Sequence, residues 1–238
     1  MLLLKLFFPL LIIALVCSDE AQAFKLHHSK HAKTTYLPTQ IGTIQVAKPA
    51  FVTFVRNSDQ ASSTDLKYHL AVSSFNGAPF SKDYVHYYSN LTKQALLANA
   101  TLSYFTLNNA NLVWPNEISA VNASLFYDKA QPNDPYGGLI VPGGFLVPTK
   151  SNGNVLYYRF LNRDRSNVTL EQAIQLNSDD QEWFYHRVKL ADINGDNVLD
   201  ILTCRSIKPT IGSATVQLVA LVYDQQAQSY QEYVIAQG

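Results

Sequence analysis

The stretch DINGDNVLD carries acidic and amide side chains at alternate positions between two apolar runs. Asp192, Asn194 and Asp196 are two residues apart, and Asp200 follows where the next apolar run begins. Alternate side chains of a tight loop converge on one point, to which Val198 can add its backbone carbonyl. Carboxylate, amide and carbonyl oxygens are the ligands that Ca²⁺ prefers. The spacing therefore predicts a calcium site in this loop.

The flanks of this loop are strand-like, so the prediction is a β-loop calcium site and not an EF-hand; a metal-free turn is the alternative. An EF-hand starts in the same way, but it needs helices on both sides and a glutamate at the twelfth position, where this chain has Thr203. In metal-free turns, Asp and Asn side chains bind their own backbone instead. Three neighbouring carboxylates repel one another without a cation, which favours the metal. Gly195 permits the bend, and Asn197 is expected to adopt the left-handed conformation that asparagine tolerates.

The sequence DINGDNVLDIL resembles the FG-GAP or VCBS repeat, whose loop reads D-x-[DN]-x-D-G-x-x-D. This repeat occurs in the β-propeller of integrin α subunits and in many secreted proteins. Asn197 departs from the glycine of that pattern. By this resemblance the calcium ligands are the side chains of Asp192, Asn194, Asp196 and Asp200 and the carbonyl of Val198.

The N-terminal residues 1–23 have the features of a secretory signal peptide. An apolar run from Leu6 to Cys17 is followed by a polar stretch and by small residues at Ala21 and Ala23. A membrane anchor is the alternative, but the run contains Pro9 and is shorter than the roughly 20 residues needed to span a bilayer. No later run is long and apolar enough to span. We therefore expect a secreted, extracellular product.

The charge of the chain argues against nucleic-acid binding, and its cysteine content argues against a disulfide within the mature chain. The chain has 18 basic and 18 acidic residues, and loss of Lys5, Asp19 and Glu20 with the leader leaves 17 and 16. A nearly neutral chain lacks the basic surface of a nucleic-acid-binding protein. Cys17 also leaves, so Cys204 has no disulfide partner in the mature chain. Its apolar surroundings predict a buried thiol, and an intermolecular disulfide is the alternative.

Short runs rich in Val, Tyr, Phe, Leu and Thr recur throughout residues 49–238, after a polar segment at 24–48. Clusters of Gly, Pro, Asn, Ser and Asp separate them, which predicts an antiparallel all-β fold. The only stretches that suggest helical turns are LTKQALLANA and TLEQAIQL.

Three segments share one plan, in which an apolar strand and a loop precede a strand that ends in tyrosine. They cover roughly residues 50–92, 110–162 and 183–226, and they align Tyr88, Tyr158 and Tyr223 as packing residues. Ordinary strand and turn patterns of a β-sandwich are the alternative. The spacing and the resemblance together predict a partial β-propeller of about three four-stranded blades.

Other candidate sites are weaker. Four N-x-S/T sequons predict glycosylation at Asn90, Asn99, Asn122 and Asn167. A histidine cluster (His27, His28 and His31) could bind a transition metal, although a polar tail accounts for it as well. The acidic residues Asp179, Asp180 and Glu182 could support acid-base chemistry, although a solvated turn accounts for them equally. No nucleophile elbow, zinc-protease motif or phosphate-binding loop is present.

These features predict a secreted calcium-binding β-propeller module for extracellular protein or glycan recognition and adhesion, in which calcium is structural. The absence of catalytic motifs favours binding over catalysis. The rival hypothesis is an exported hydrolase or lyase acting on polysaccharide or lipid, with Asp180 and Glu182 at a pocket. Propellers use about four to eight blades. We therefore also expect either a longer propeller or self-association through open blade faces.

Overall fold

The structure is a computed structural model that describes most of the chain from residue 43 onward. The described residues are 43–57, 68–98, 102–107, 112–121, 136–147, 149–162, 164–174, 182–209, 211–224, 226–227 and 229–238. Several predictions lie outside these residues: the signal peptide, the histidine cluster, Asn99, Asn122, Asp179 and Asp180.

The chain divides into two compact units. One comprises Met1–Ile44 and Lys93–Ala100 and contains the short helix α1 (Lys93–Leu97). This helix confirms the helical turn expected in LTKQALLANA. The other unit comprises Gln45–Thr92 and Thr101–Gly238 and contains all the described strands.

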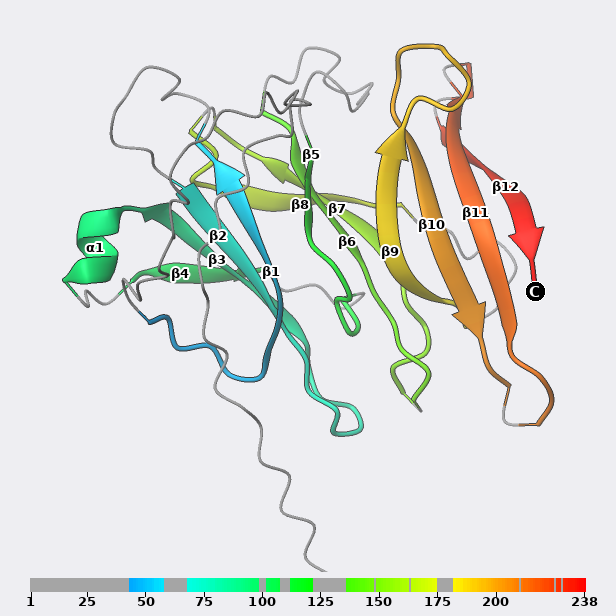
Figure 1. The fold of residues 1–238 in the computed structure, drawn as a ribbon, viewed down its shortest axis with the longest axis horizontal. Helices are drawn as coiled ribbons and strands as arrows, with labels where there is room; N and C mark the ends of the chain where they lie inside the picture. Colours follow the sequence, from blue (N-terminus) through cyan, green and yellow to red (C-terminus); the bar gives the residue numbers. More distant parts are fainter. Residues whose placement is uncertain are drawn as a thin grey trace, which may run out of the picture. The chain divides into compact units, whose positions relative to one another are not determined.

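The strands of the larger unit form three four-stranded antiparallel sheets, each in the order of the chain (Figure 1). The first sheet consists of β1 (Pro49–Arg56), β2 (Tyr68–Ser74), β3 (Tyr84–Leu91) and β4 (Tyr104–Leu107). The second consists of β5 (Ser119–Val121), β6 (Gly138–Pro142), β7 (Val155–Phe160) and β8 (Val168–Ile174). The third consists of β9 (Phe184–Ala191), β10 (Asp200–Ile207), β11 (Thr215–Asp224) and β12 (Ser229–Gln237). The all-β prediction is confirmed.

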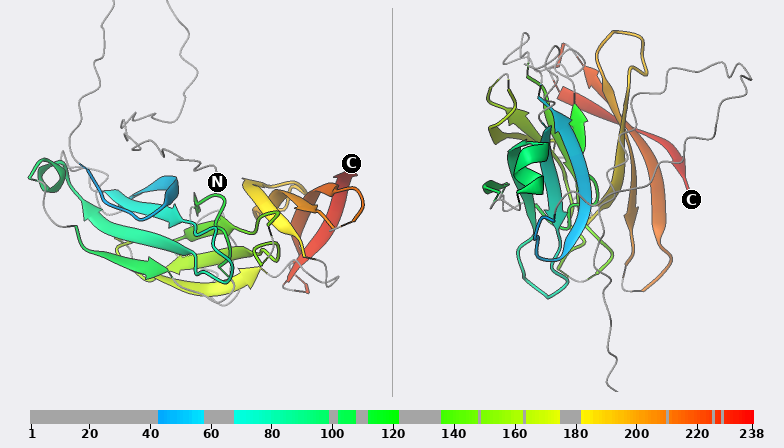
Figure 2. Two further views of the ribbon diagram at one scale, coloured as in Figure 1. Left: turned by 90° about the horizontal axis from the view of Figure 1, so that it is seen from below. Right: turned by 60° about the vertical axis from the view of Figure 1, so that its left-hand side comes forward.

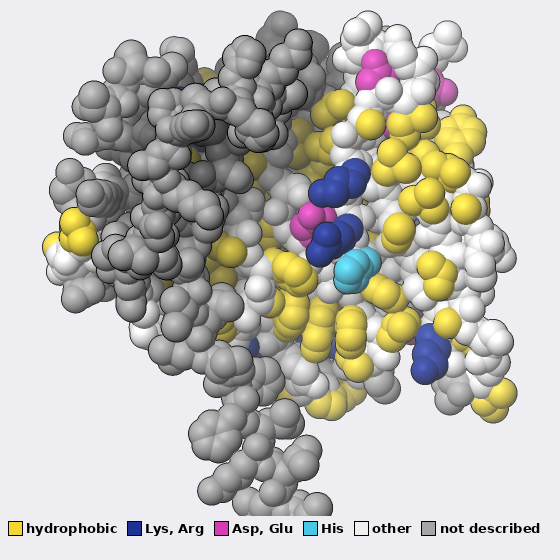
Figure 3. Space-filling model, in the orientation of Figure 1, with side chains coloured by type: hydrophobic (Ala, Val, Ile, Leu, Met, Phe, Trp, Pro, Cys, Tyr) yellow, Lys and Arg dark blue, Asp and Glu magenta, His cyan; other side chains and the backbone are white. Residues whose placement is uncertain are grey.

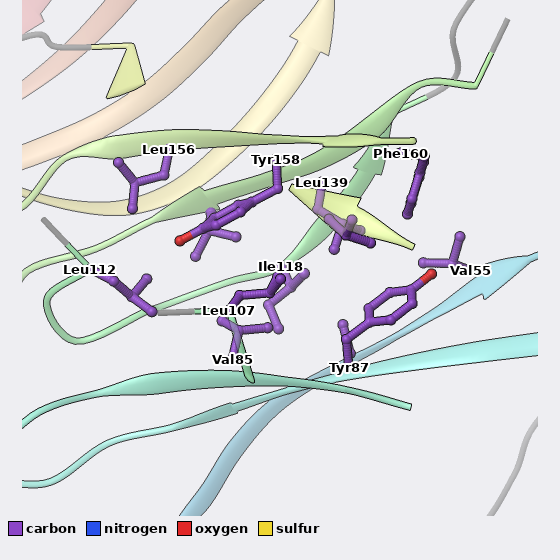
Figure 4. Close-up of a cluster of buried hydrophobic side chains, with 13 residues drawn as sticks. Val55, Val85, Tyr87, Leu107, Leu112, Ile118, Leu139, Leu156, Tyr158 and Phe160 are labelled. Atoms are coloured by element: carbon purple, nitrogen blue, oxygen red, sulfur yellow. The ribbon is translucent and has the colours of Figure 1, made fainter. Parts of the chain in front are cut away.

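Two hydrophobic clusters hold the sheets together in chain order. The first joins the first and second sheets (Figure 4). Its fully buried members include Val55, Val85 and Tyr87 from the first sheet and Leu139 and Phe160 from the second. Burial of one such side chain contributes about 1.5 to 3 kcal/mol. Packing between sheets is therefore a large part of the stability of this unit.

The second sheet is buried on both faces, which accounts for the largely apolar sequences of its two middle strands, β6 and β7. In β7, Leu156 and Tyr158 enter the first cluster, while Val155 and Tyr157 enter the second, which joins the second and third sheets. Successive side chains of a strand point to opposite faces, so a sheet between two others needs apolar residues at every position. Alternation of apolar and polar residues is accordingly absent from β7.

The sheets stack in the same orientation. The first strands β1 and β5 are in contact, as are the last strands β4 and β8, and β6 contacts β9. Two further views show the sheets side by side in chain order (Figure 2). Connections between the second and third strand of each sheet therefore emerge at one edge, the lower edge in Figure 1, and the loop between β9 and β10 lies at the upper edge.

Three details differ from the sequence prediction or refine it. The stretch TLEQAIQL forms most of the strand β8 and not a helical turn, so this expectation was wrong. Pairing with β7 fixes its conformation, because tertiary contacts override weak local helix propensity. The last strand of each sheet also lies outside the predicted repeat boundaries. Tyr88, Tyr158 and Tyr223 lie in the third strands of the three sheets and are buried, as expected for packing residues.

Cys204 is exposed, so the prediction of a buried thiol was wrong. In β10, Ile201, Thr203 and Arg205 are buried, and Ile201 packs in the cluster shared with the second sheet. Cys204 alternates with these residues and points to the opposite face. The apolar sequence of this strand suggests burial on both sides, whereas the third sheet packs against the second sheet with one face only. Hydrophobic side chains remain visible over the third sheet in Figure 3.

Candidate metal centre in the loop between β9 and β10

Asp192 organises the predicted calcium loop. Its Oδ1 accepts hydrogen bonds from the backbone N–H groups of Gly195 (2.7 Å) and Asp196 (3.1 Å), and its Oδ2 accepts one from Asn197 (2.9 Å). Three donors of one short segment therefore point to one carboxylate. The chain bends around Asp192, which lies at the end of β9 at the upper edge of the third sheet (Figure 1).

Two left-handed residues make this bend possible. Gly195 has φ of 78° and Asn197 has φ of 65°. A Cβ atom added to Gly195 would meet nothing within 4 Å, so the glycine is required by its backbone angle and not by lack of space. Asparagine tolerates this region better than most residues. The predicted left-handed conformation of Asn197 is confirmed.

The structure brings Asn194 and Asp196 together beside Asp192. The amide Nδ2 of Asn194 donates to Oδ2 of Asp196 at 3.1 Å, and Oδ1 of Asn194 accepts from the Asp196 backbone N–H at 3.0 Å. Oδ1 of Asp196 accepts from the backbone N–H of Val198 at 2.8 Å. Asp192 and Asn194 are exposed and Asp196 is half-buried, so their oxygens are accessible to an ion from solvent.

Asp200 is held differently from the other predicted ligands. Its side chain is fully buried, and its two oxygens accept backbone hydrogen bonds from Ile193 (2.8 Å) and from Tyr223 of β11 (3.0 Å). It thus ties the start of the loop to the neighbouring strand. Within the part of the chain that the structure describes, no three His, Cys, Asp or Glu side chains form a group that could hold a metal ion.

The oxygen atoms of the loop are nevertheless of the kind that binds a hard cation such as Ca²⁺. Asp192, Asn194 and Asp196 offer carboxylate and amide oxygens, and a carboxylate oxygen has lone pairs for more than one partner. The hydrogen bonds within the loop hold these three residues next to one another before any ion binds. Asp200 and the carbonyl of Val198 complete the predicted ligand set.

Two sequons lie within the described residues, at Asn90 and Asn167. Both side chains are exposed. Asn90 is at the end of β3 with φ of 57°, and its backbone N–H donates to Nδ1 of His69 at 3.1 Å. The backbone N–H of Asn167 donates to Oδ1 of Asn162 at 3.1 Å. Both residues are therefore accessible from solvent, and glycosylation at these positions stays a prediction.

Of the acidic cluster considered for catalysis, only Glu182 is described. It is exposed, and its Oε2 accepts a hydrogen bond from the Ser151 hydroxyl at 2.5 Å.

The sequence analysis did not predict the buried polar contacts that join distant segments. Asp83, before β3, forms an ion pair with Lys150 at 2.7 Å, and both side chains are buried. The amide of Asn116 donates to the carbonyls of Gly144 and Tyr185, both at 2.7 Å. The partners are 67, 28 and 69 residues apart in the chain. Only the packing of the sheets brings them together.

Comparison with protein-family models, curated proteins and solved structures finds no match to this chain. The resemblance to FG-GAP or VCBS repeats therefore rests on the loop and its flanking strands. Among the described residues, no helix has the length and hydrophobicity needed to cross a membrane.

Proposed function

We propose that this chain is a secreted, calcium-binding β-propeller module that recognises extracellular proteins or glycans. The observation that carries the proposal is the conformation of residues 192–197. Asp192, Asn194 and Asp196 are gathered on one short loop by hydrogen bonds to its own backbone. Calcium would neutralise the two carboxylates and fix the loop between β9 and β10.

The sheet arrangement supports the propeller part of the proposal. A propeller blade is a four-stranded antiparallel sheet, and blades pack face to face around a centre. The three sheets here have this strand order. Between the first and second sheets, β1 contacts β5 and β4 contacts β8, and β9 of the third sheet contacts β6 of the second.

Calcium titration with a matched control tests the metal site. We expect Ca²⁺ to raise the melting temperature of the wild-type chain. With a Kd of about 10⁻⁴ to 10⁻³ M, calcium at several times that concentration should add about 1 kcal/mol to the free energy of unfolding. The variant Asp196→Ala should lose this response. Asp224→Ala is the control, because Asp224 caps the turn between β11 and β12 through backbone hydrogen bonds of 2.8 and 2.9 Å. Equal calcium responses in wild type and Asp196→Ala would refute the site.

The recognition function needs a separate measurement. Binding of the purified chain to a glycan or cell-surface array, without turnover of model glycosides, supports the proposal. Turnover that falls in Glu182→Gln would instead favour the exported hydrolase.

A further inference from the structure

The loops at the lower edge of the three sheets carry protruding apolar side chains. These loops join the second and third strands of each sheet, and we name them together the lower-edge loops: residues 75–83, 143–154 and 208–214. Phe80 is 88% exposed in the first loop and Ile211 is 91% exposed in the third. Phe145 and Leu146 are exposed in the middle loop. Each of the three loops thus carries at least one exposed large apolar residue. Figure 1 shows the three loops at the lower edge of the sheets.

The first two of these loops are held in fixed positions. Trp114 stacks between Phe75 and Phe145, with ring centroids 4.7 and 4.9 Å apart. The buried ammonium of Lys150 bonds the carboxylate of Asp83 and the carbonyl of Ser81. The aromatic stack and the Lys150 contacts form a fixed base for these two loops. The exposed apolar side chains of the loops are therefore preorganised, which lowers the entropic cost of binding.

Backbone hydrogen bonds extend this base to the third sheet. The N–H of Gly153 donates to the carbonyl of Trp183 at 2.8 Å, and the N–H of Tyr185 donates to the carbonyl of Gly143 at 2.9 Å. The middle loop is thus fastened to the start of β9, at the same edge as the loop that carries Ile211.

The charge at this edge is predominantly positive. Lys48, Lys82 and Lys208 are exposed at or beside the lower-edge loops, while the acidic Asp83 is buried and neutralised by Lys150. Among the described residues of this edge, Glu182 is the exposed acidic side chain. Figure 3 shows hydrophobic side chains along the lower margin of the molecule and a basic side chain just above them on the right.

Both described sequons lie at the opposite edge. Asn90 is at the upper end of β3, and Asn167 is in the connection between β7 and β8. Glycans on either residue would leave the lower-edge loops uncovered.

From this combination we infer that the lower-edge loops dock on the surface of an anionic lipid membrane. Phe80 and Ile211 enter the boundary between headgroups and acyl chains, while Lys82 and Lys208 contact the anionic headgroups. A bilayer surface accepts separate apolar side chains at several points together with nearby lysines. A protein partner would instead need a contiguous complementary patch. This inference goes beyond the proposed calcium-dependent recognition, because it uses the opposite edge of the sheets.

Vesicle co-sedimentation tests the inference. The full chain is mixed with vesicles of phosphatidylcholine alone or with about one third phosphatidylserine, in Ca²⁺ and in chelator. We expect binding to the anionic vesicles in both conditions. The double variant Phe80→Asp and Ile211→Asp should bind at least tenfold more weakly. Lys82→Gln and Lys208→Gln should each weaken binding about fivefold on anionic vesicles.

A matched control places an aspartate at the upper edge. Leu161 is 45% exposed beyond the end of β7, so Leu161→Asp adds the same charge away from the lower-edge loops and should bind like wild type. The single variant Ile211→Ser keeps the test valid if the double variant misfolds, because this side chain is almost fully exposed.

Three outcomes would overturn the inference. The first is that wild type does not sediment with anionic vesicles. The second is that the lower-edge variants bind as wild type does. The third is that binding disappears in chelator and in Asp196→Ala, which would assign it to the calcium loop. A failed calcium titration together with intact, chelator-resistant vesicle binding would refute the proposed metal site and leave the membrane inference standing.

Discussion

The carboxylate of Asp83 and the ammonium of Lys150 are 2.7 Å apart and buried where a loop of the first sheet meets a loop of the second. Asp83 also accepts backbone hydrogen bonds from Asn76 (2.8 Å) and Trp114 (3.0 Å). One buried ion pair thus connects three segments that are distant in the chain.

Removal of one member of this pair should be strongly destabilising. We expect Lys150→Met to lower the free energy of unfolding by about 3 to 5 kcal/mol, because it leaves a buried carboxylate without its counter-charge. The double variant Asp83→Asn and Lys150→Met should lose less than the sum of the two single variants. Denaturant unfolding of all four proteins measures this coupling. Additive losses would contradict it.

Two buried tyrosines should respond differently to loss of their hydroxyl groups. The Tyr87 hydroxyl donates to the carbonyl of Arg165 at 2.7 Å, whereas the Tyr158 hydroxyl has no hydrogen-bond partner among the described residues. Tyr87→Phe should therefore cost about 1 kcal/mol or more of stability, and Tyr158→Phe should be neutral or stabilising. Urea unfolding distinguishes the two, and a larger loss in Tyr158→Phe would contradict the assignment.

His69 should make stability depend on pH. Burial lowers the pKa of His69 below its ordinary value of 6.5, although a hydrogen bond to the Asp164 carbonyl partly opposes this. Its Nδ1 accepts from Asn90 and its Nε2 lies 2.6 Å from that carbonyl, so the neutral ring fits the site. The unfolded chain then binds a proton at higher pH than the folded chain. The contribution to stability is full above pH 6.5 and is lost as the pH falls toward the folded pKa.

Unfolding measured at pH values above and below 6.5 checks this dependence. The wild type should be less stable on the acid side, and His69→Gln should remove most of the difference. His86→Gln is the comparison, because burial also lowers the pKa of His86, but this side chain is only half-buried. Equal pH dependence in wild type and His69→Gln would disprove the role of His69.

Cys204 should react readily with thiol reagents in the folded chain. Its side chain is exposed on the open face of the third sheet. Labelling under native conditions should proceed at a rate close to that in denaturant, and Cys204→Ser gives the background. Protection that is released only on unfolding would show that this face is covered.

Composition and local sequence pattern were sufficient to predict the strands and to predict which residues share the loop between β9 and β10. Short β-branched and aromatic runs separated by turn residues predicted an all-β chain, since strand formation depends on side chains that suit a pleated surface. The spacing of Asp192, Asn194 and Asp196 predicted that they share one loop, because residues two apart cannot separate far in a tight turn. The left-handed Asn197 followed from the same local pattern.

Tertiary structure decided which faces are buried and which distant residues meet. Sequence could not reveal that the third sheet leaves Cys204 exposed, because burial depends on the neighbouring sheet and not on the strand itself. Asp200 fits the ligand pattern, yet both its oxygens accept backbone hydrogen bonds, and the bond from Tyr223 forms only when β11 pairs with β10. The Asp83 and Lys150 pair likewise depends on the stacking of two sheets, because chain separation carries no information about contact across such an interface.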